Sequence, residues 1–135
     1  MRTTAATVAH DLRLVDVEQV KMFYVANHLA NVALYDKEAD AVAIPGTVTV
    51  SSSQKNGLTA NEITFQRSDL TADTLSELTR LRTRRLIAFY RDSMGNNRVC
   101  GSVTWPMALS FTTDVDGINV TLKGTSTGPD PIFAL

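Results

Sequence analysis

Short runs of alternating apolar and polar residues, separated by turn-forming residues, dominate the chain from residue 42 onward. The runs 47–51, 62–66 and 118–123 each place a valine, isoleucine, leucine or phenylalanine at every second position. Successive side chains of a β-strand point to opposite faces, so this pattern is typical of strands with one buried face. Asp116-Gly117 falls between two alternating runs, as in a type I′ hairpin turn. The pattern predicts a mainly antiparallel β fold.

One helix interrupts the strands and is expected over residues 72–84. Thr71 is a suitable N-cap residue, because its hydroxyl can accept a hydrogen bond from a free backbone N–H of the first turn. An apolar stripe at helical spacing is formed by Leu75, Leu78 and Leu81. We therefore expect a single domain over residues 1–135 of the mainly β (α+β) class. It would be an antiparallel β-sandwich or barrel with one amphipathic helix packed on it.

The ends of the chain and the segment before residue 41 carry weaker patterns. Residues 1–10 are small and polar and are expected to form a flexible N-terminal arm, and residues 125–135 an extended C-terminal tail. β-branched and aromatic residues favour a strand over 20–25, although a helix over 18–34 also fits the spacing. Residues 27–40 stay ambiguous between helix and strand.

A polar segment between two predicted strands is the main candidate for contact with other molecules. Residues 51–61 are interpreted as a loop that projects from the domain and becomes ordered only against a neighbouring subunit, because it has too few apolar residues to pack on its own domain. Its candidate contact residues are Ser52, Gln54, Lys55 and Asn56. The apolar C-terminal tip is expected to dock on a partner or on the domain's own sheet through Ile132, Phe133 and Leu135.

Two segments are expected to lie at the edges of the sheet, residues 42–50 and 108–115. Both contain few of the lysines and arginines that usually prevent edge strands from pairing with other chains. Pro45-Gly46 is expected to form a turn near the start of the first segment. Edges without such protection predict pairing with neighbouring copies.

The composition contains no sign of secretion, of a membrane segment or of a disulfide. The formal net charge is −1, and Cys100 is the only cysteine. The first residues are too polar for a secretory signal, and no apolar run approaches the roughly 20 residues needed to span a bilayer. We expect a soluble protein of the cytoplasmic type.

No residue pattern identifies a catalytic or metal site. His10 and His28 lack the spacing of a zinc site, and residues 92–97 lack the glutamate that completes a calcium loop. Cys100 has no evident activating partner and is interpreted as a small core residue. Phosphate-binding loops and nucleophile elbows do not occur. We expect no catalytic residue, no metal and no cofactor, and hence a protein that is not an enzyme.

Arginines gather in and after the predicted helix, and they allow two interpretations. The cluster consists of Arg80, Arg82, Arg84, Arg85, Arg91 and Arg98. The favoured interpretation is a solvated helix face, or a set of charges that pair with the carboxylates of a neighbour, with Arg82 and Arg84 as candidate contact residues. A nucleic-acid surface is the alternative, but the nearby Phe89 and Tyr90 lie in a buried type of strand and not on a stacking platform.

The order of these elements resembles a known group of proteins. Paired strands around a long polar segment, one helix and two closing hairpins over residues 40–124 are similar to the small β-sandwich of tail-tube, tail-terminator and head–tail joining proteins of tailed bacteriophages. The stretch 98–107 and the hairpin at Asp116-Gly117 also look like small phage-type proteins. In that fold, subunits form rings by pairing edge strands, and the long loop contacts the next ring.

The resemblance implies a non-enzymatic structural protein of the virion, assembled in the host cytoplasm and forming rings with copies of itself and contacts with other virion proteins. DNA would at most pass through the lumen, with no sequence-specific binding and no membrane contact. Two other functions remain open. One is a monomeric binding module that uses the arginine cluster for nucleic acid or an acidic protein, and the other is a small enzyme.

Overall fold

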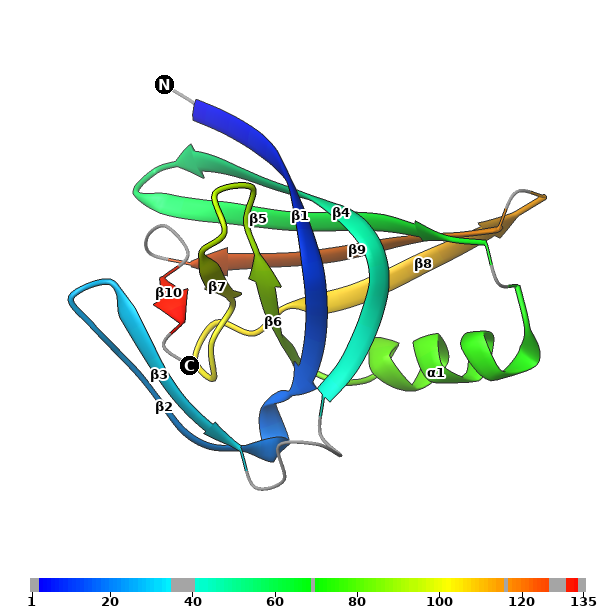
Figure 1. The fold of residues 1–135 in the computed structure, drawn as a ribbon, viewed down its shortest axis with the longest axis horizontal. Helices are drawn as coiled ribbons and strands as arrows, with labels where there is room; N and C mark the ends of the chain where they lie inside the picture. The colour runs from blue at the N-terminus through cyan, green and yellow to red at the C-terminus, as the bar shows by residue number, and fades with distance from the viewer. Residues whose placement is uncertain (1–2, 35–40, 69, 116, 127–130, 134–135) are drawn as a thin grey trace.

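The computed structural model of the chain describes residues 3–34, 41–68, 70–115, 117–126 and 131–133. These residues form ten β-strands, one α-helix and one short 3-10 helix (Figure 1). Their bounds are β1 Thr3–Asp16, the 3-10 helix Val17–Gln19, β2 Val20–Ala26, β3 Leu29–Leu34, β4 Ala41–Lys55, β5 Leu58–Arg67, α1 Ala72–Arg82, β6 Leu86–Arg91, β7 Asn97–Cys100, β8 Ala108–Asp114, β9 Gly117–Ser126 and β10 Ile132–Phe133. The predicted class, mainly β with one helix, is confirmed.

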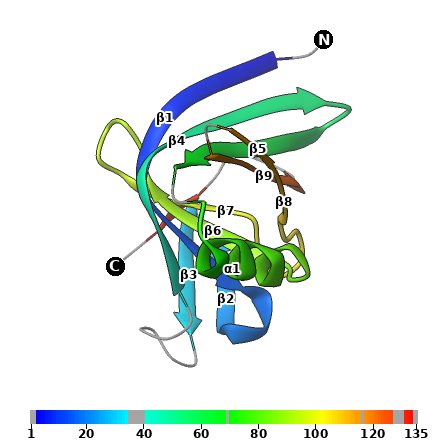
Figure 2. The ribbon, with the colours of Figure 1, turned by 90° about the vertical axis from the view of Figure 1, so that its right-hand side faces the viewer.

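The strands form one sheet in the order β2-β3-β10-β7-β6-β1-β4-β5-β9-β8. All neighbouring strands are antiparallel except β10 and β3, which are parallel. The sheet curls so that β8 comes round toward β6 (Figure 2). Leu86 and Met107 form one bridge there, with N···O distances of 2.9 and 2.8 Å. This single bridge joins the two sides without closing the sheet into a barrel.

A bulge lets β1 and β4 follow this curve. Their pairing shifts between His10 and Leu12 of β1, so that Pro45 and Gly46 of β4 lie opposite the single residue Asp11, which has a φ of 54°. Opposite the shift, Gly46 in β4 has a φ of 82°. An extra residue bends a strand and increases its twist. The turn expected at Pro45-Gly46 is therefore wrong, because β4 runs through these residues as one bent strand.

The main core lies inside the curve of the sheet, and α1 covers its open side. Thr71 caps the helix as predicted, with its hydroxyl accepting a hydrogen bond from Thr74 N at 3.2 Å. Two leucines of the predicted stripe, Leu78 and Leu81, are buried, and Leu75 packs beside them. The helix ends at Arg82, two residues earlier than expected. The Thr83 hydroxyl donates to Arg80 O at 2.8 Å, and this contact closes the last turn.

A second, smaller core lies on the opposite face of β1, β6 and β7. There the β2–β3 hairpin folds over the sheet, and the cluster consists of the buried Val15, Ala30, Ile87, Phe89 and Val99 with Val17, Val20, Phe23, Val32 and Leu34 partly buried around it. Strand β6 therefore faces apolar cores on both sides. This explains why its sequence, Leu86 to Tyr90, is continuously apolar and not alternating.

Two sequence expectations about ends and edges are corrected by the structure, and one is confirmed. Residues 3–10 belong to β1 and pair with β4 and β6, so the expected N-terminal arm is wrong there. Residues 42–50 lie in β4, which is flanked by β1 and β5 and is not an edge. The predicted strand over 20–25 is confirmed as β2, and 29–34 form β3, whereas residues 35–40 lie outside the described residues.

The expected loop over 51–61 is also wrong, because β4 and β5 continue through it to a two-residue turn. Lys55 pairs with Leu58 around Asn56-Gly57, whose φ angles are 55° and 79°. Positive φ at both central residues is what a type I′ turn requires, and Asn-Gly is its preferred sequence. The polar residues on either side are held in a ladder in which β1 and β9 also take part.

The predicted hairpin near Asp116 is confirmed, with a shift in its position. Asp114 pairs with Gly117, so Gly117 is the first residue of β9, while Asp116 lies outside the described residues. Gly117 is buried and has a φ of 135°. A Cβ at this position would overlap the carbonyl oxygen of Arg67. A glycine is therefore needed here for close approach to β5 as well as for its backbone conformation.

Candidate functional site

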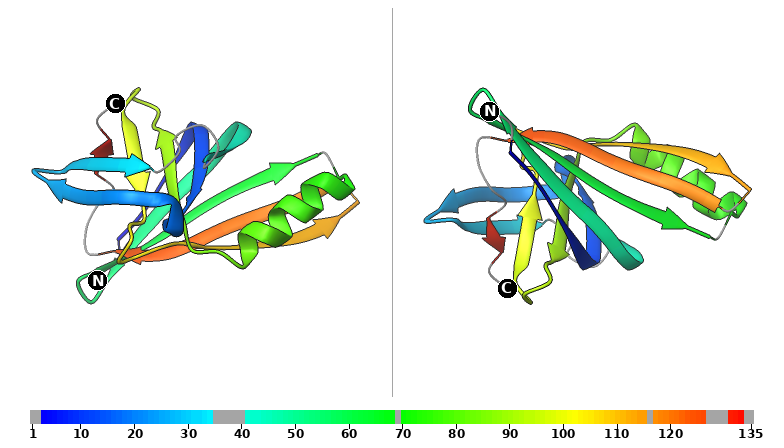
Figure 3. Two further views of the ribbon diagram at one scale, coloured as in Figure 1. Left: turned by 90° about the horizontal axis from the view of Figure 1, so that it is seen from below. Right: turned by 90° about the horizontal axis from the view of Figure 1, so that it is seen from above.

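The two ends of the sheet lie on opposite sides of the molecule and differ in how they are covered (Figure 3). Strand β8 ends the strand order, so the edge expected over residues 108–115 is confirmed. Helix α1 lies beside β8 on the side away from β9 (Figures 1 and 2). The Arg82 guanidinium lies 5.2 Å from the centre of the Phe111 ring, which joins the helix to this strand. The helix thus shields the β8 edge in the way that natural proteins often protect an edge strand.

Strand β2 at the other end carries no such cover within the described residues. Its only partner there is β3, with which it forms a hairpin around Asn27-His28. Met22, Tyr24 and Val25 are 46%, 52% and 49% exposed. Large apolar side chains on a strand with one free edge are unusual for a monomer, because such an edge pairs readily with other chains. We define Val20–Ala26 as the β2 edge.

The C-terminal segment fixes the hairpin to the body of the domain. Ile132 N donates to His28 O at 2.9 Å, and Val99 N donates to Pro131 O at 3.1 Å. In β10, Ile132 pairs with Leu29, and Phe133 pairs with Ala30. Docking of Ile132 and Phe133 on the domain's own sheet, one of the two predicted possibilities, is what the structure shows. Leu135 lies outside the described residues.

The predicted contact residues of the polar segment lie at one end of the sheet, in the β4–β5 hairpin. Ser52 is half-buried, Gln54 is exposed, Lys55 ends β4, and Asn56 begins the turn. We define the polar extension as the four strand ends that pair here, residues 3–6, 51–55, 58–62 and 123–126. A shallow polar depression on it is lined by serines of β4, Asn61 and Glu62 of β5, and Lys123 to Thr125 of β9.

The polar extension has almost no apolar core of its own. Buried apolar side chains end at Val50 in β4 and begin again at Ile63 in β5. Between them the buried residues are Thr59 and Asn61, and Asn61 Nδ2 donates to Ser126 Oγ at 2.9 Å. Backbone ladders and polar side-chain contacts therefore hold this end together.

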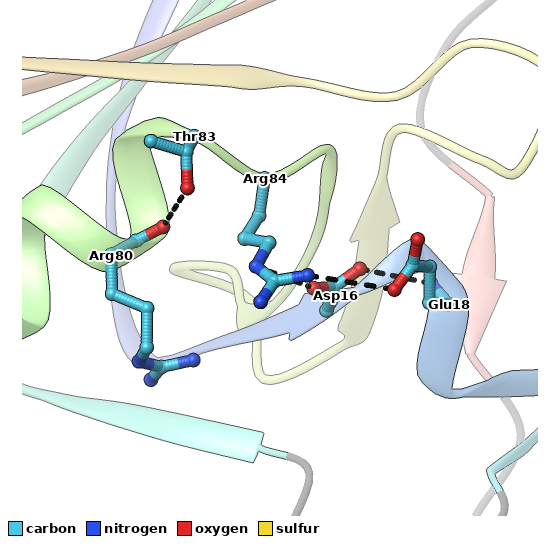
Figure 4. Close-up of polar contacts among 5 residues, drawn as sticks. All are labelled: Asp16, Glu18, Arg80, Thr83 and Arg84. Atoms are coloured by element: carbon cyan, nitrogen blue, oxygen red, sulfur yellow. Dashed lines mark hydrogen bonds and ion pairs between the residues drawn. The ribbon is translucent and has the colours of Figure 1, made fainter.

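The arginines do not form one basic surface, because several are paired within the protein. Arg84 Nε lies 3.6 Å from Asp16 Oδ2, and Arg84 Nη1 lies 3.5 Å from Glu18 Oε2 (Figure 4). Arg98 Nε lies 3.2 Å from Asp92 Oδ2. Arg82 stacks on Phe111, as described above. The predicted contact residues Arg82 and Arg84 thus contact the domain itself. Arg84 lies near the start of the β2 edge, because its partner Glu18 comes two residues before Val20.

Asp92 organises the turn between β6 and β7. Its Oδ1 accepts hydrogen bonds from Met94 N at 3.0 Å and Asn96 N at 2.9 Å. Partial burial raises the pKa of Asp92, but these hydrogen bonds and the charge of Arg98 outweigh it, so the pKa lies below its usual value of 3.8. This carboxylate therefore stabilises a turn.

Neither a cluster of potential metal ligands nor an exposed cysteine occurs among the described residues. Among them, no three histidine, cysteine, aspartate or glutamate side chains are placed to hold a metal ion together. Cys100 is buried, as expected for a core residue. The described helices are too short and too polar to cross a bilayer. The most distinctive features of the surface are the β2 edge and the polar extension.

Comparison with known proteins adds no further assignment. No protein-family model matches the chain, and no curated protein or solved structure does so either. The candidate sites therefore rest on the geometry described above.

None of the predicted contact residues lies on the β2 edge. A signal for it exists in the sequence, because Asn27-His28 follows a run rich in β-branched and aromatic residues, and asparagine tolerates the positive φ of a tight turn. The φ angles of Asn27 and His28 are 53° and 62°. Which strand of the hairpin stays unpaired depends on the position of β10, and local sequence contains no such information.

Proposed function

We propose that this protein is a structural subunit of a larger assembly, a ring-forming, non-enzymatic component of the tail or head–tail connector of a tailed-phage particle. Such a subunit would be assembled in the host cytoplasm and would contact copies of itself and other virion proteins. Support comes from the resemblance in element order and from the surfaces described above, which suit contacts with macromolecules better than binding of a small molecule.

The observation that carries the proposal is the polar extension. Within residues 51–62 the only large apolar residue is Leu58, yet the segment is a regular hairpin flanked by β1 and β9. A stiff, polar end of a sheet contributes little to the core of the domain. It is suited to contact another subunit through backbone and hydroxyl groups, in the way that the polar rim of an interface does.

The alternative, a monomeric module that binds nucleic acid through the arginine cluster, has less support. The ion pairs of Arg84 and Arg98 and the stacking of Arg82 use these side chains within the domain. A phosphate-binding surface needs several cations that are free to contact phosphates, since each contact adds to the affinity and its salt dependence.

The test is a shortened hairpin. Residues 54–59 are replaced by Asn-Gly, so that Ser53 and Ala60, which already form a hydrogen-bonded pair, flank a new type I′ turn. The expected result is a folded protein, because the buried apolar residues lie outside the deleted segment, and the loss of rings or tubes in electron micrographs. Gln54→Ala in the intact hairpin is the control and should still assemble. Normal assembly of the shortened protein, or a wild type that forms no rings or tubes, would contradict the proposal.

A further inference from the structure

The backbone of the β2 edge has hydrogen-bonding groups that point away from the domain. Ala26 and Leu29 flank the two-residue turn and pair with each other. In such a hairpin the flanking residues exchange both hydrogen bonds, and the pattern then alternates along the strand. The N–H and C=O groups of Ala26, Tyr24 and Met22 therefore face β3, whereas those of Phe23 and Val25 face outward.

We infer that this edge pairs with the β2 edge of a second copy, in antiparallel orientation about a two-fold axis at Phe23. Strand β2 has seven residues, and Phe23 is the central one. An axis at Phe23 sets Met22, Phe23 and Tyr24 of each strand opposite the same three residues of the other. The strand is regular there, whereas the pairing of β2 with β3 shifts between Val20 and Met22. The same axis also places outward-facing groups of each strand opposite those of the other. The regular part of both strands and the outward-facing groups of Phe23 thus meet at this axis.

Side chains in this register complement each other. Met22 of one copy lies opposite Tyr24 of the other on the exposed face, in a non-hydrogen-bonded pair, where cross-strand side chains approach most closely. Sulfur–aromatic contacts of this kind are favourable. On the other face, the two partly buried Phe23 side chains meet at the axis and continue the second core across the interface. Lys21, the only charged residue of the strand, lies at the shift and away from the axis, so the two lysines do not face each other.

Pairing with the β2 edge of a second copy fits this edge better than pairing with the β8 end of the sheet. Strand β8 has α1 beside it, so the helix hinders the approach of another strand to that edge. Each copy then contributes one free edge, and two identical edges form a closed, two-fold contact. Such a contact adds to any ring contact and does not rest on the proposed function. An interface limited to one strand lies below the roughly 1,200 Å² of stable complexes, so we expect dissociation at micromolar concentrations, on the order of 1–100 μM.

Charge-swapped variants test the register directly. One variant carries Met22→Lys and Tyr24→Lys, and the other carries Met22→Glu and Tyr24→Glu. Each should be monomeric by sedimentation velocity at concentrations where the wild type has twice the monomer mass, because like charges then lie opposite each other. An equimolar mixture should restore the doubled mass, because residue 22 of one variant meets residue 24 of the other. Circular dichroism checks that both variants are folded.

A second pair of variants tests the backbone contact without added charge. Val25→Pro removes an outward-facing N–H that makes no bond to β3, whereas Val25→Ala keeps it. The proline variant should weaken dimerisation at least tenfold more than the alanine variant. A wild type that stays monomeric at several hundred micromolar would overturn the inference. So would charge variants that dimerise alone, or a mixture that does not. A wild type that forms the β2-edge dimer but no rings would instead count only against the proposed function.

Discussion

The β2–β3 and β4–β5 hairpins are closed in the same way but are stabilised by different means. Both turn through two residues with positive φ, Asn27-His28 and Asn56-Gly57. The β4–β5 hairpin has paired strands on both sides, β1 next to β4 and β9 next to β5. The β2–β3 hairpin has the two-residue β10 on one side, and β2 ends the strand order. The β4–β5 hairpin is thus held by backbone ladders, and the β2–β3 hairpin by the apolar cluster beneath it.

This difference determines which kind of contact each hairpin can make. A strand with partners on both sides has no free backbone donors or acceptors, so it can meet another subunit only through its side chains. A strand with one partner keeps a row of free N–H and C=O groups and can extend its sheet into another molecule. The polar extension is therefore suited to a side-chain interface, and the β2 edge to strand pairing.

The largest expected effect comes from removing apolar packing beneath the β2–β3 hairpin. Ile87 is completely buried in the second core. Ile87→Ala should lower the free energy of unfolding by about 3 kcal/mol in urea denaturation, since the truncation leaves a cavity that the short β10 does little to close. The matched control is Leu58→Ala in the polar extension. Leu58 is 41% exposed, so its loss should cost below about 0.5 kcal/mol. Equal losses would show that both hairpins depend on apolar packing.

A smaller effect, with opposite signs in the two hairpins, is expected at the turns. Gly57→Val places a β-branched residue at a φ of 79° and should destabilise by about 1–3 kcal/mol. His28 has a φ of 62°, and His28→Gly relieves this conformation, so it should leave stability unchanged or raise it by up to about 1 kcal/mol. Thermal unfolding of both variants measures the difference. Stabilisation by Gly57→Val would mean that the β4–β5 turn is not of type I′.

The smallest effect concerns a third hairpin, β6–β7, whose turn depends on a charge. Asp92 has a lowered pKa in the folded protein, so its carboxylate stabilises the fold above its ordinary pKa, and this contribution is lost as the pH falls through the lowered value. Asp92→Asn should be slightly less stable than the wild type at pH 7. The difference should shrink below about pH 4 and vanish at still lower pH. A difference that stays constant from pH 7 to pH 2 would exclude the charge as its cause.

Much of the fold follows from local patterns in the sequence. The cap at Thr71, the stripe Leu75, Leu78 and Leu81, and the alternation in β5, β8 and β9 are signals that neighbouring residues carry, and each matches the structure. Asn56-Gly57 is also a typical turn sequence, but the polar residues around it resemble a loop. Those residues are ordered because β1 and β9 pair beside them, and such long-range pairing leaves no local trace.

The candidate sites were less predictable for the same reason. Ser52 and Gln54 lie in strand β4 and not in the loop that the sequence predicted, and their role in subunit contact stays a prediction. Arg84 was singled out for a neighbour's carboxylates, but it pairs with Asp16 and Glu18 of its own chain, far apart in sequence. The exposure of Met22 and Tyr24 depends on β10, a segment near the other end of the chain, inserting between β3 and β7.

Residue-resolved amide exchange tests the contrast between the two hairpins most directly. At low micromolar concentration, the amides of Phe23 and Val25 should exchange rapidly, while those of Ser52 and Ser53, which lie between β1 and β5, should be protected. At several hundred micromolar, the Phe23 and Val25 amides should become protected and those of β4 should not change. Protection of Phe23 and Val25 that is the same at both concentrations, or rapid exchange of Ser52 and Ser53, would contradict a free β2 edge beside a fully paired polar extension.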